Sequence, residues 1–217
     1  MDVDNIMIQL DQWVAAHGSG RYISSDTIVT TDTYRVIEDY GIQQVKEEIK
    51  QFVEVLIGHG KLNSALEIGL GIFGSTHYLW KQIFNHVSTI ELEKSRCLSF
   101  RENYRKHTNR QLFNENSYFY FGYSHLPDIV EAVYKNIGEV DLLFIDGGHQ
   151  YKEILVDWLL YHHLVPAGGV IAFHDIVATN TGVPEFISQL NIDIKRIVCS
   201  KDCGIGYYIK EVKKWHK

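Results

Sequence analysis

Two short strings in the second half of the sequence combine acids with histidines. Asp146-Gly147-Gly148-His149 follows the apolar run Asp141–Ile145, and His174-Asp175 follows the apolar run Val170–Phe173. Two carboxylates that share one site repel each other unless a cation or a proton lies between them. Two acids suit Mg²⁺, or Mn²⁺ when a histidine joins the ligands. The sequence therefore indicates Asp146, His174 and Asp175 as candidate metal ligands.

The same side chains could take part in a reaction. A divalent ion can hold a substrate hydroxyl and lower its pKa, which produces a nucleophile. His149 and His174 are alternative general bases, so the candidate catalytic residues are Asp146, His149 and His174. A structural interpretation stays open beside this one, in which Asp146 is a turn aspartate and His174 bonds only to backbone.

A glycine-rich string lies near residue 70. It reads Glu67-Ile68-Gly69-Leu70-Gly71-Ile72-Phe73-Gly74-Ser75, and it predicts a strand, a tight turn and the start of a helix. The same spacing occurs in dinucleotide-binding loops, which hold a pyrophosphate at the helix N-terminus. S-adenosylmethionine has a sulfonium and an amino-acid end instead, for which an acid such as Glu67 is useful. We therefore expect cofactor contacts from Glu67, Gly69, Gly71, Gly74 and Ser75.

Later strand ends offer further cofactor contacts. Glu91 ends the run Val87–Ile90, where an acid can accept hydrogen bonds from both hydroxyls of a ribose. Tyr123 and Ser124 follow Tyr118–Phe121, where Tyr123 could stack on an adenine and Ser124 could bond its edge, although a plain turn fits equally well. Asp146 joins these candidates because it ends the next strand.

The elements that must position these residues alternate along the chain. From Ser64 onward, short apolar runs alternate with amphipathic helical stretches, which predicts an α/β fold with a mainly parallel sheet and helices on both faces. Ligands of such sheets lie at the carboxyl ends of the strands, where every candidate above falls. The runs Ile192–Val198 and Gly204–Ile209, separated by Ser200-Lys201-Asp202, predict a terminal hairpin. We expect residues 1–60 to form a helical or lid-like extension and residues 61–217 to form the binding domain.

Composition narrows the classes of function. Lys and Arg number 21 against 27 Asp and Glu, a net charge of −6, which does not favour a nucleic-acid partner. No apolar run is long enough to cross a membrane, and the N-terminus does not resemble a secretory signal. The three cysteines, Cys97, Cys199 and Cys203, favour a reducing compartment and hence the cytoplasm. Zinc binding by Cys199 and Cys203 is conceivable, but inert thiols are the better interpretation.

Together, these motifs resemble class I S-adenosylmethionine-dependent methyltransferases. The resemblance rests on Glu67 to Gly74, Glu91, the string from Phe144 to Tyr151, and the string from Pro166 to Asp175. It is strongest toward small-molecule O-methyltransferases, including catechol-type, macrocin-type and cephalosporin-hydroxylase-like enzymes. The resemblance implies a Rossmann-like doubly wound sheet of seven strands with the last antiparallel. It also implies methionine-end binding at Glu67 and Gly69, and metal binding at Asp146 and Asp175.

The sequence departs from that family at two places. His174 stands where some metal-dependent relatives carry an acid or amide, and Gly122-Tyr123-Ser124 stands where the family often has Gly-Asp-Ser. We expect O-methylation of a small molecule or sugar, with S-adenosylmethionine and Mg²⁺ or Mn²⁺ as cofactors, and leave homo-oligomer formation open. The alternatives are an NAD-dependent oxidoreductase and a non-catalytic module that binds the cofactor.

Overall fold

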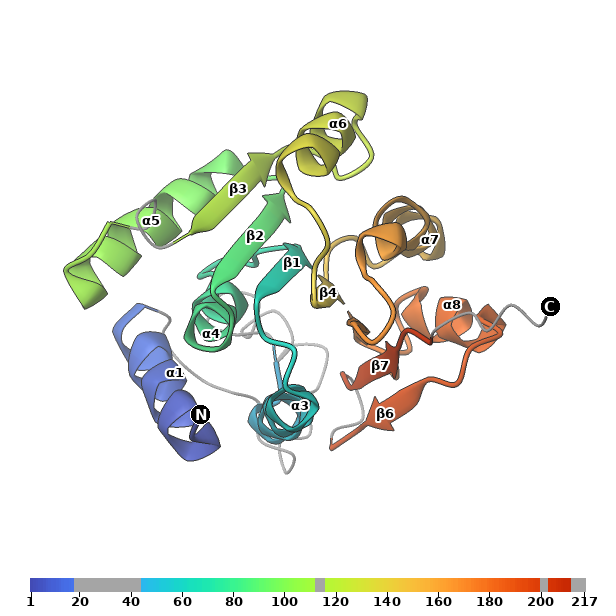
Figure 1. Ribbon diagram of the computed structural model, residues 1–217, viewed down its shortest axis with the longest axis horizontal. Coiled ribbons are helices and arrows are strands. Elements are labelled where there is room, and N and C mark those ends of the chain that lie inside the picture. The colour runs from blue at the N-terminus through green and yellow to red at the C-terminus, as the bar shows by residue number, and fades with distance from the viewer. Residues whose placement is uncertain (18–43, 112–115, 200–202, 212–217) are drawn as a thin grey trace.

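A single mixed sheet forms the centre of the molecule. The computed structural model describes residues 1–17, 44–111, 116–199 and 203–211. Within them, seven strands pair in the order β3-β2-β1-β4-β5-β7-β6 (Figure 1). The strands are β1 Ser64–Ile68, β2 His86–Glu91, β3 Ser117–Phe121, β4 Leu142–Ile145, β5 Val170–His174, β6 Lys195–Ile197 and β7 Ile205–Ile209. Of these seven strands, β7 alone runs opposite to the other six, which confirms the predicted fold class.

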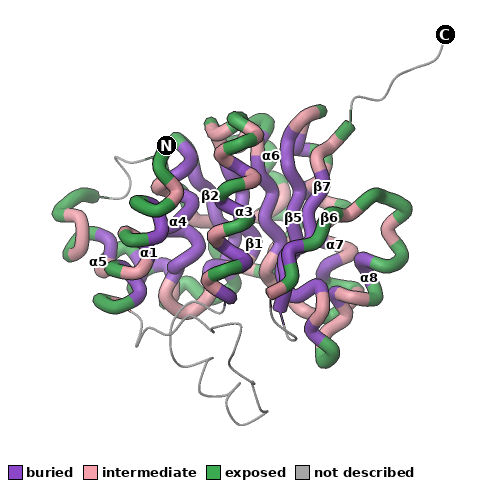
Figure 2. The backbone as a smooth tube through the Cα atoms, turned by 90° about the horizontal axis from the view of Figure 1, so that it is seen from below, coloured by how far each residue is buried: buried purple, intermediate pink, exposed green. Residues whose placement is uncertain are grey.

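Helices cover both faces of this sheet. They are α1 Val3–His17, α3 Lys46–His59, α4 Ser75–Ile83, α5 Lys94–Thr108, α6 Pro127–Asn136, α7 Tyr151–Tyr161 and α8 Val183–Gln189, with a 3₁₀ turn at His162–Leu164. One hydrophobic cluster joins the sheet to α1, α3, α4 and α5, and a second joins it to α6, α7 and α8. Buried residues follow the strands between these layers (Figure 2). The helices therefore cover both faces of the central strands, and a ligand can approach these strands at their ends.

The two-residue period of a strand decides which face each side chain of β1 meets. Ala65 belongs to the first hydrophobic cluster, whereas Leu66 and Ile68 belong to the second. Glu67 must therefore point toward the same helices as Ala65. This alternation places an ionisable group inside the layer of α4.

The described part of residues 1–60 packs directly on the sheet layer. Trp13 of α1 is fully buried and stacks on Tyr78 of α4, with ring centroids 4.4 Å apart. Glu48 of α3 accepts hydrogen bonds from the backbone N–H groups of Cys199 and Gly204, at 2.7 and 2.9 Å. Residues 1–17 and 44–59 thus share the core of the sheet. Residues 18–43 of the expected extension and the turn Ser200–Asp202 lie outside the described residues.

The helix before β1 contains one glycine and ends at another. α3 includes Gly58 and continues to His59. Gly60 alone takes the left-handed conformation, with φ of 81°, and its N–H bonds to the carbonyl of Leu56. Among the described residues, no helix has the length and apolar character needed to cross a membrane.

Candidate active site

A cleft of about 360 Å³ opens at the carboxyl ends of the parallel strands. Its lining brings together most of the ligand-binding candidates of the sequence, which come from the ends of β1, β2, β3 and β4. These are Gly69, Gly71, Glu91, Tyr123, Ser124, Asp146 and His149. Glu67, Gly74, Ser75, His174 and Asp175 do not line this cleft. The parallel topology therefore assembles a ligand site from residues that are far apart in the sequence.

The three glycines of the loop after β1 are needed for different reasons. All three have positive φ, 94° at Gly69, 67° at Gly71 and 62° at Gly74. A Cβ on Gly69 would lie 2.1 Å from the carbonyl oxygen of Asp146, and one on Gly74 would lie 2.4 Å from the ring of Phe100. A Cβ on Gly71 would meet no atom within 4 Å. Gly69 and Gly74 permit close packing inside the protein, whereas Gly71 leaves space at the cleft.

Glu67 lies behind the glycine loop, and its carboxyl group points away from the cleft. The side chain is fully buried and accepts hydrogen bonds from the Trp80 indole at 3.1 Å and the Thr89 hydroxyl at 2.8 Å. Burial raises the pKa of Glu67 to about 8, so the carboxyl is mainly protonated at neutral pH. This placement does not favour the expected direct contact between Glu67 and the methionine end of S-adenosylmethionine. Glu67 instead joins β1 to α4 and β2 through Trp80 and Thr89.

A buried histidine extends the network around Glu67. The ring of His77 contacts the Thr89 hydroxyl at 2.7 Å through Nδ1 and the Ser117 hydroxyl through Nε2. Burial lowers the pKa of His77 to about 3, so the ring is neutral. The network joins α4 to β2 and β3 without a net charge, which avoids the cost of burying an ion. Sequence patterns could not identify these partners of His77, because the contacts join three elements that are separate in the chain.

Glu91 holds the loop and faces the cleft at the same time. Its Oε2 accepts the backbone N–H of Leu70 at 2.8 Å, and its Oε1 accepts the N–H of Glu93 at 2.9 Å. Arg96 approaches Oε1 at 3.3 Å and also lines the cleft. A carboxylate oxygen can accept two hydrogen bonds, so Oε2 retains capacity for a ligand hydroxyl. The placement of Glu91 is thus compatible with the expected ribose contact.

At the loop after β3, an acid that the sequence analysis missed accompanies the predicted residues. Tyr123 is 54% exposed, and Ser124 donates its hydroxyl to Oδ1 of Asp157. Asp157 lies on α7, is only 3% exposed and lines the cleft. Burial raises the pKa of Asp157 to about 6. Asp157 lies in the middle of an amphipathic helix, where the sequence does not indicate that an acid faces a ligand site.

The two acid-histidine strings meet beside the cleft, which Asp146 and His149 line and His174 and Asp175 do not. Nδ1 of His174 lies 3.3 Å from Asp146 Oδ1 and 3.0 Å from Asp175 Oδ1. Nε2 of His149 lies 3.8 Å from Asp146 Oδ1 and 3.4 Å from Asp175 Oδ2. Asp175 takes a left-handed conformation with φ of 61°, which is uncommon outside glycine and marks a constrained turn. The four residues thus form one cluster, as expected from adjacent parallel strands.

The charges in this cluster support each other. Burial alone would raise the pKa of Asp146, but His174 and His149 outweigh it and lower that pKa to about 2. Burial would likewise lower the pKa of His174, but Asp175 and Asp146 raise it well above its ordinary value. The nearby carboxylate of Asp146 raises the pKa of His149. These shifts favour a charged imidazolium at His174 beside an ionised carboxylate at Asp146.

Gln44, just before α3, completes the surroundings of Asp146. The side chain is buried, and its Nε2 donates to Asp146 Oδ2 at 2.7 Å. Its Oε1 is buried and has no hydrogen-bond partner among the described residues. Gln44 could not be found from the sequence, because 102 positions separate it from Asp146.

The donor set at this end of the cleft fits a divalent ion. Asp146, His149 and Asp175 can each offer one ligand atom, and the three atoms lie within 4.8 Å of one another. Two carboxylates and one imidazole are ligands that Mg²⁺ or Mn²⁺ accepts. The sequence named His174 as the histidine ligand, whereas this group contains His149 in its place. His174 lies behind both carboxylates, where its Nδ1 can orient them.

Comparisons with known proteins agree with this architecture. A family model described as a methyltransferase domain matches residues 66–176, just over half of the chain. An O-methyltransferase from Bacillus cereus, solved with S-adenosylhomocysteine, has a TM-score of 0.57 at 17% identity, covering 95% of this chain and 91% of the other. The O-methyltransferase TomG from Streptomyces achromogenes, solved with S-adenosylmethionine, has a TM-score of 0.59 at 14% identity, covering 95% and 90%.

Two further similarities are more limited. The MycE methyltransferase of mycinamycin biosynthesis, solved with Mg and S-adenosylhomocysteine, has a TM-score of 0.55 at 12% identity, covering 82% of this chain and 53% of the other. An uncharacterised protein of Acanthamoeba polyphaga mimivirus is 50% identical over 36 residues, and the matched segment spans only 16% of that protein. The family match and the sheet order exclude the oxidoreductase alternative. The chain therefore belongs to the methyltransferase domain family, as a class I S-adenosylmethionine-dependent methyltransferase with an O-methyltransferase-like fold.

Proposed function

We propose that this protein methylates a hydroxyl group of a small molecule or sugar, with the help of a divalent cation. The observation that carries the proposal is the group Asp146, His149 and Asp175, which lies next to the glycine loop. This group can bind an oxygen nucleophile beside the place where a methyl donor would lie. The structural likeness to O-methyltransferases supports the same reaction.

The cleft suggests how the methyl donor would lie. The open space at Gly71 and the remaining capacity of Glu91 fit an adenosine ribose, as in other adenosine-binding sheets. The adenine would then extend toward Tyr123, Ser124 and Asp157. The methionine end would lie near Gly69 and Asp146, where the unpartnered Oε1 of Gln44 could accept a hydrogen bond from an ammonium group.

The residues of the cluster would position and deprotonate the acceptor. Asp146, His149 and Asp175 would hold a divalent ion, which when bound would lower the pKa of a coordinated hydroxyl. His149 is 40% exposed in its side chain, so it can also reach a substrate proton as a general base. The sulfonium of S-adenosylmethionine supplies an activated methyl group. The protein would then contribute mainly by aligning the hydroxyl with that methyl.

Charge at the cleft favours a small, uncharged or cationic acceptor. The cleft is lined by four acids and one arginine, which are Glu91, Asp146, Glu153, Asp157 and Arg96. Such a surface would repel a phosphate backbone, which agrees with the expected absence of a nucleic-acid partner. The location in the cytoplasm and the oligomeric state stay predictions.

The proposal can be tested in two stages. Calorimetric titration of the purified chain with S-adenosylhomocysteine should show binding, and no binding at millimolar concentrations would contradict the cofactor assignment. A panel of catechols, polyols and sugars should then be screened for release of S-adenosylhomocysteine, with Mg²⁺ or with EDTA. Turnover that EDTA abolishes and Mg²⁺ restores supports cation assistance. Turnover that EDTA leaves unchanged would instead favour His149 as the base, and methylation only at nitrogen or carbon would overturn O-methylation.

A further inference from the structure

Two cysteines flank the turn that joins β6 to β7. The register of this antiparallel pair runs as far as Ile197 opposite Ile205. Carried two residues further, the same register places Cys199 opposite Cys203. Residues that lie opposite each other in an antiparallel pair have Cα atoms about 4.5–5.5 Å apart. That separation lies within the range of about 4.4–6.8 Å that a disulfide spans.

Contacts beside the two cysteines support this register. A Cβ on Gly204 would lie 3.2 Å from Cγ2 of Val198, which is its expected register partner. Glu48 accepts the backbone N–H of Cys199 at 2.7 Å and that of Gly204 at 2.9 Å. The Glu48 side chain is fully buried, so one fixed carboxylate holds the two sides of the hairpin together next to Cys203.

The side chains of the two cysteines lie on the same side of the hairpin. Cys203 and Val45 are buried in one small hydrophobic cluster, and Cys199 packs against that cluster. Gln51 of α3 donates to Sγ of Cys199 at 3.2 Å. Val45 directly precedes α3, so both thiols lie on the side that α3 covers. Opposite positions with side chains on one face are the arrangement from which a cross-strand disulfide can form.

We propose that Cys199 and Cys203 form a reversible disulfide, which makes this hairpin a site of oxidative modification. Both residues are thiols in the structure. The oxidant is a low-molecular-weight disulfide such as oxidised glutathione. The half-buried Cys199 attacks one of its sulfurs as the thiolate and releases one thiol, and Cys203 then attacks the mixed disulfide and releases the second. Two electrons pass to the small disulfide, and the protons of both cysteines end on the two released thiols.

The loop length and the surroundings of the thiols determine how this bond behaves. A disulfide that closes so short a loop removes little entropy from the unfolded chain, so it stabilises the fold only slightly. Burial and the carboxylate of Glu48 raise the pKa of Cys199, so its thiolate is scarce and exchange is slow at neutral pH. The bond is therefore suited to reversible modification, and its formation is best measured at equilibrium.

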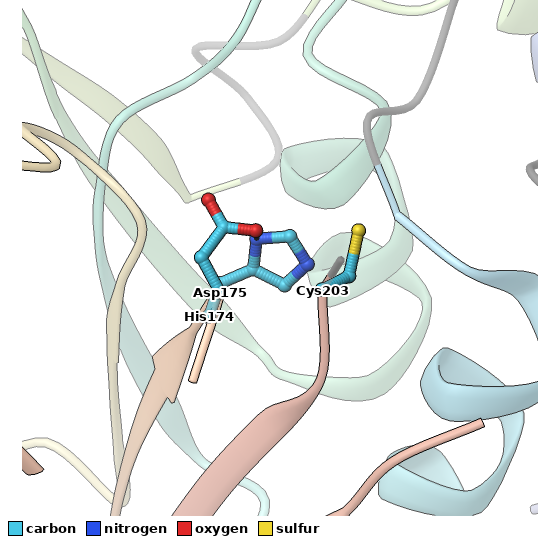
Figure 3. Close-up of side chains that lie close together, drawn as sticks. All are labelled: His174, Asp175 and Cys203. Carbon is cyan, nitrogen blue, oxygen red and sulfur yellow. Dashed lines mark ion pairs between the residues drawn. The ribbon is translucent and has the colours of Figure 1, made fainter. Parts of the chain in front are cut away.

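Cys203 places this bond beside the acid-histidine cluster. In Figure 3, the sulfur of Cys203 lies on the opposite side of the His174 ring from Asp175. This sulfur lies within 4.8 Å of a possible ligand atom on each of these two residues. Formation of the bond would therefore change the surroundings of His174, whose Nδ1 lies 3.3 Å from Asp146. The disulfide itself does not depend on the methyl-transfer reaction.

Trypsin gives a direct test on the full chain, because Lys201 separates the two cysteines in the sequence. The protein is brought to equilibrium with mixtures of oxidised and reduced glutathione, remaining thiols are blocked, and the monomer is digested. Mass spectrometry should show peptides 197–201 and 202–210 joined by a disulfide, and dithiothreitol should separate them. Absence of the joined peptides in the most oxidising mixture, or their presence only in a covalent dimer, would overturn the proposal.

Substitutions then identify the cysteines that react. The intact wild type should lose two of its three thiols and the mass of two hydrogen atoms. Cys97→Ser is the matched control, since Cys97 is fully buried on α5, and it should show the same loss of mass. Cys199→Ser and Cys203→Ser should each abolish that loss. A loss of two hydrogen atoms that persists in either variant, or that disappears in Cys97→Ser, would contradict the assignment.

Discussion

Glu67 and Asp146 belong to neighbouring parallel strands and yet ionise in opposite ways. Glu67 lies one residue before the end of β1, and Asp146 directly follows β4. Glu67 meets an indole and a hydroxyl, and its pKa rises to about 8, whereas Asp146 meets two histidines, and its pKa falls to about 2. Because both are removed from water, the identity of the partners decides the charge. Glu67 is thus a neutral acid that joins buried elements, whereas Asp146 is an ionised acid that faces the cleft.

The largest expected difference concerns activity. Asp146→Asn should lower kcat/KM at least about 100-fold, because it removes a charge from the cluster that would orient the acceptor. Glu67→Gln should have little effect, because glutamine resembles the protonated acid in shape and charge. Release of S-adenosylhomocysteine with an acceptor from the screen measures both. Equal losses in two well-folded variants would show that Glu67 and Asp146 contribute equally to activity.

The glycine loop between these acids gives the next prediction. Gly71→Val should weaken the binding of S-adenosylhomocysteine at least about 100-fold, or about 2.7 kcal/mol, because its side chain would enter the cleft. Gly60→Val is a matched control, since Gly60 also has positive φ and no atom within 4 Å of an added Cβ, but lies at the end of α3. Calorimetry should show near-normal affinity for the control. Unchanged affinity in Gly71→Val would count against the loop as the binding site.

The raised pKa of Glu67 predicts how stability depends on pH. The folded protein binds this proton more tightly than the unfolded chain, whose pKa is near 4.5. The stabilisation is therefore complete below pH 4.5 and is lost as pH rises to about 8, which amounts to a few kcal/mol. Urea unfolding at pH 5 and pH 8 should show a smaller decrease in Glu67→Gln than in the wild type. An identical decrease in both proteins would show that Glu67 is already ionised at pH 5.

The pKa of Asp157, about 6, lies between the pKa values of Asp146 and Glu67. Substitution of Asp157 should have the smallest effect. If its carboxyl group accepts the adenine amino group, the wild type should prefer S-adenosylhomocysteine over its hypoxanthine analogue by about tenfold. Asp157→Asn should narrow that preference. Glu153→Gln, which changes another acid of the cleft and keeps a side chain suited to the helix cap, should not. A preference that is unchanged in Asp157→Asn would place the adenine elsewhere.

The sequence was sufficient to predict the fold and most of the strand ends. Short apolar runs separated by helical stretches define a buried parallel sheet, because strands covered on both faces need continuous apolar residues. Because β4 and β5 are parallel neighbours, Asp146, His149, His174 and Asp175 lie together at the carboxyl ends of these strands. Local residue types thus determined which side chains gather there and the class of ligand that they suit.

Tertiary structure alone decided what each of these groups does. The side-chain alternation of β1 turns Glu67 into the helix layer, where burial keeps it protonated, although its position in the motif suggests ligand contact. Packing of α3 brings Gln44 to Asp146, folding of α7 brings Asp157 to Ser124, and the β5–β7 pairing brings Cys203 to His174. These contacts join residues far apart in the chain. Their effects on charge depend on burial and on partners, and a linear pattern contains neither.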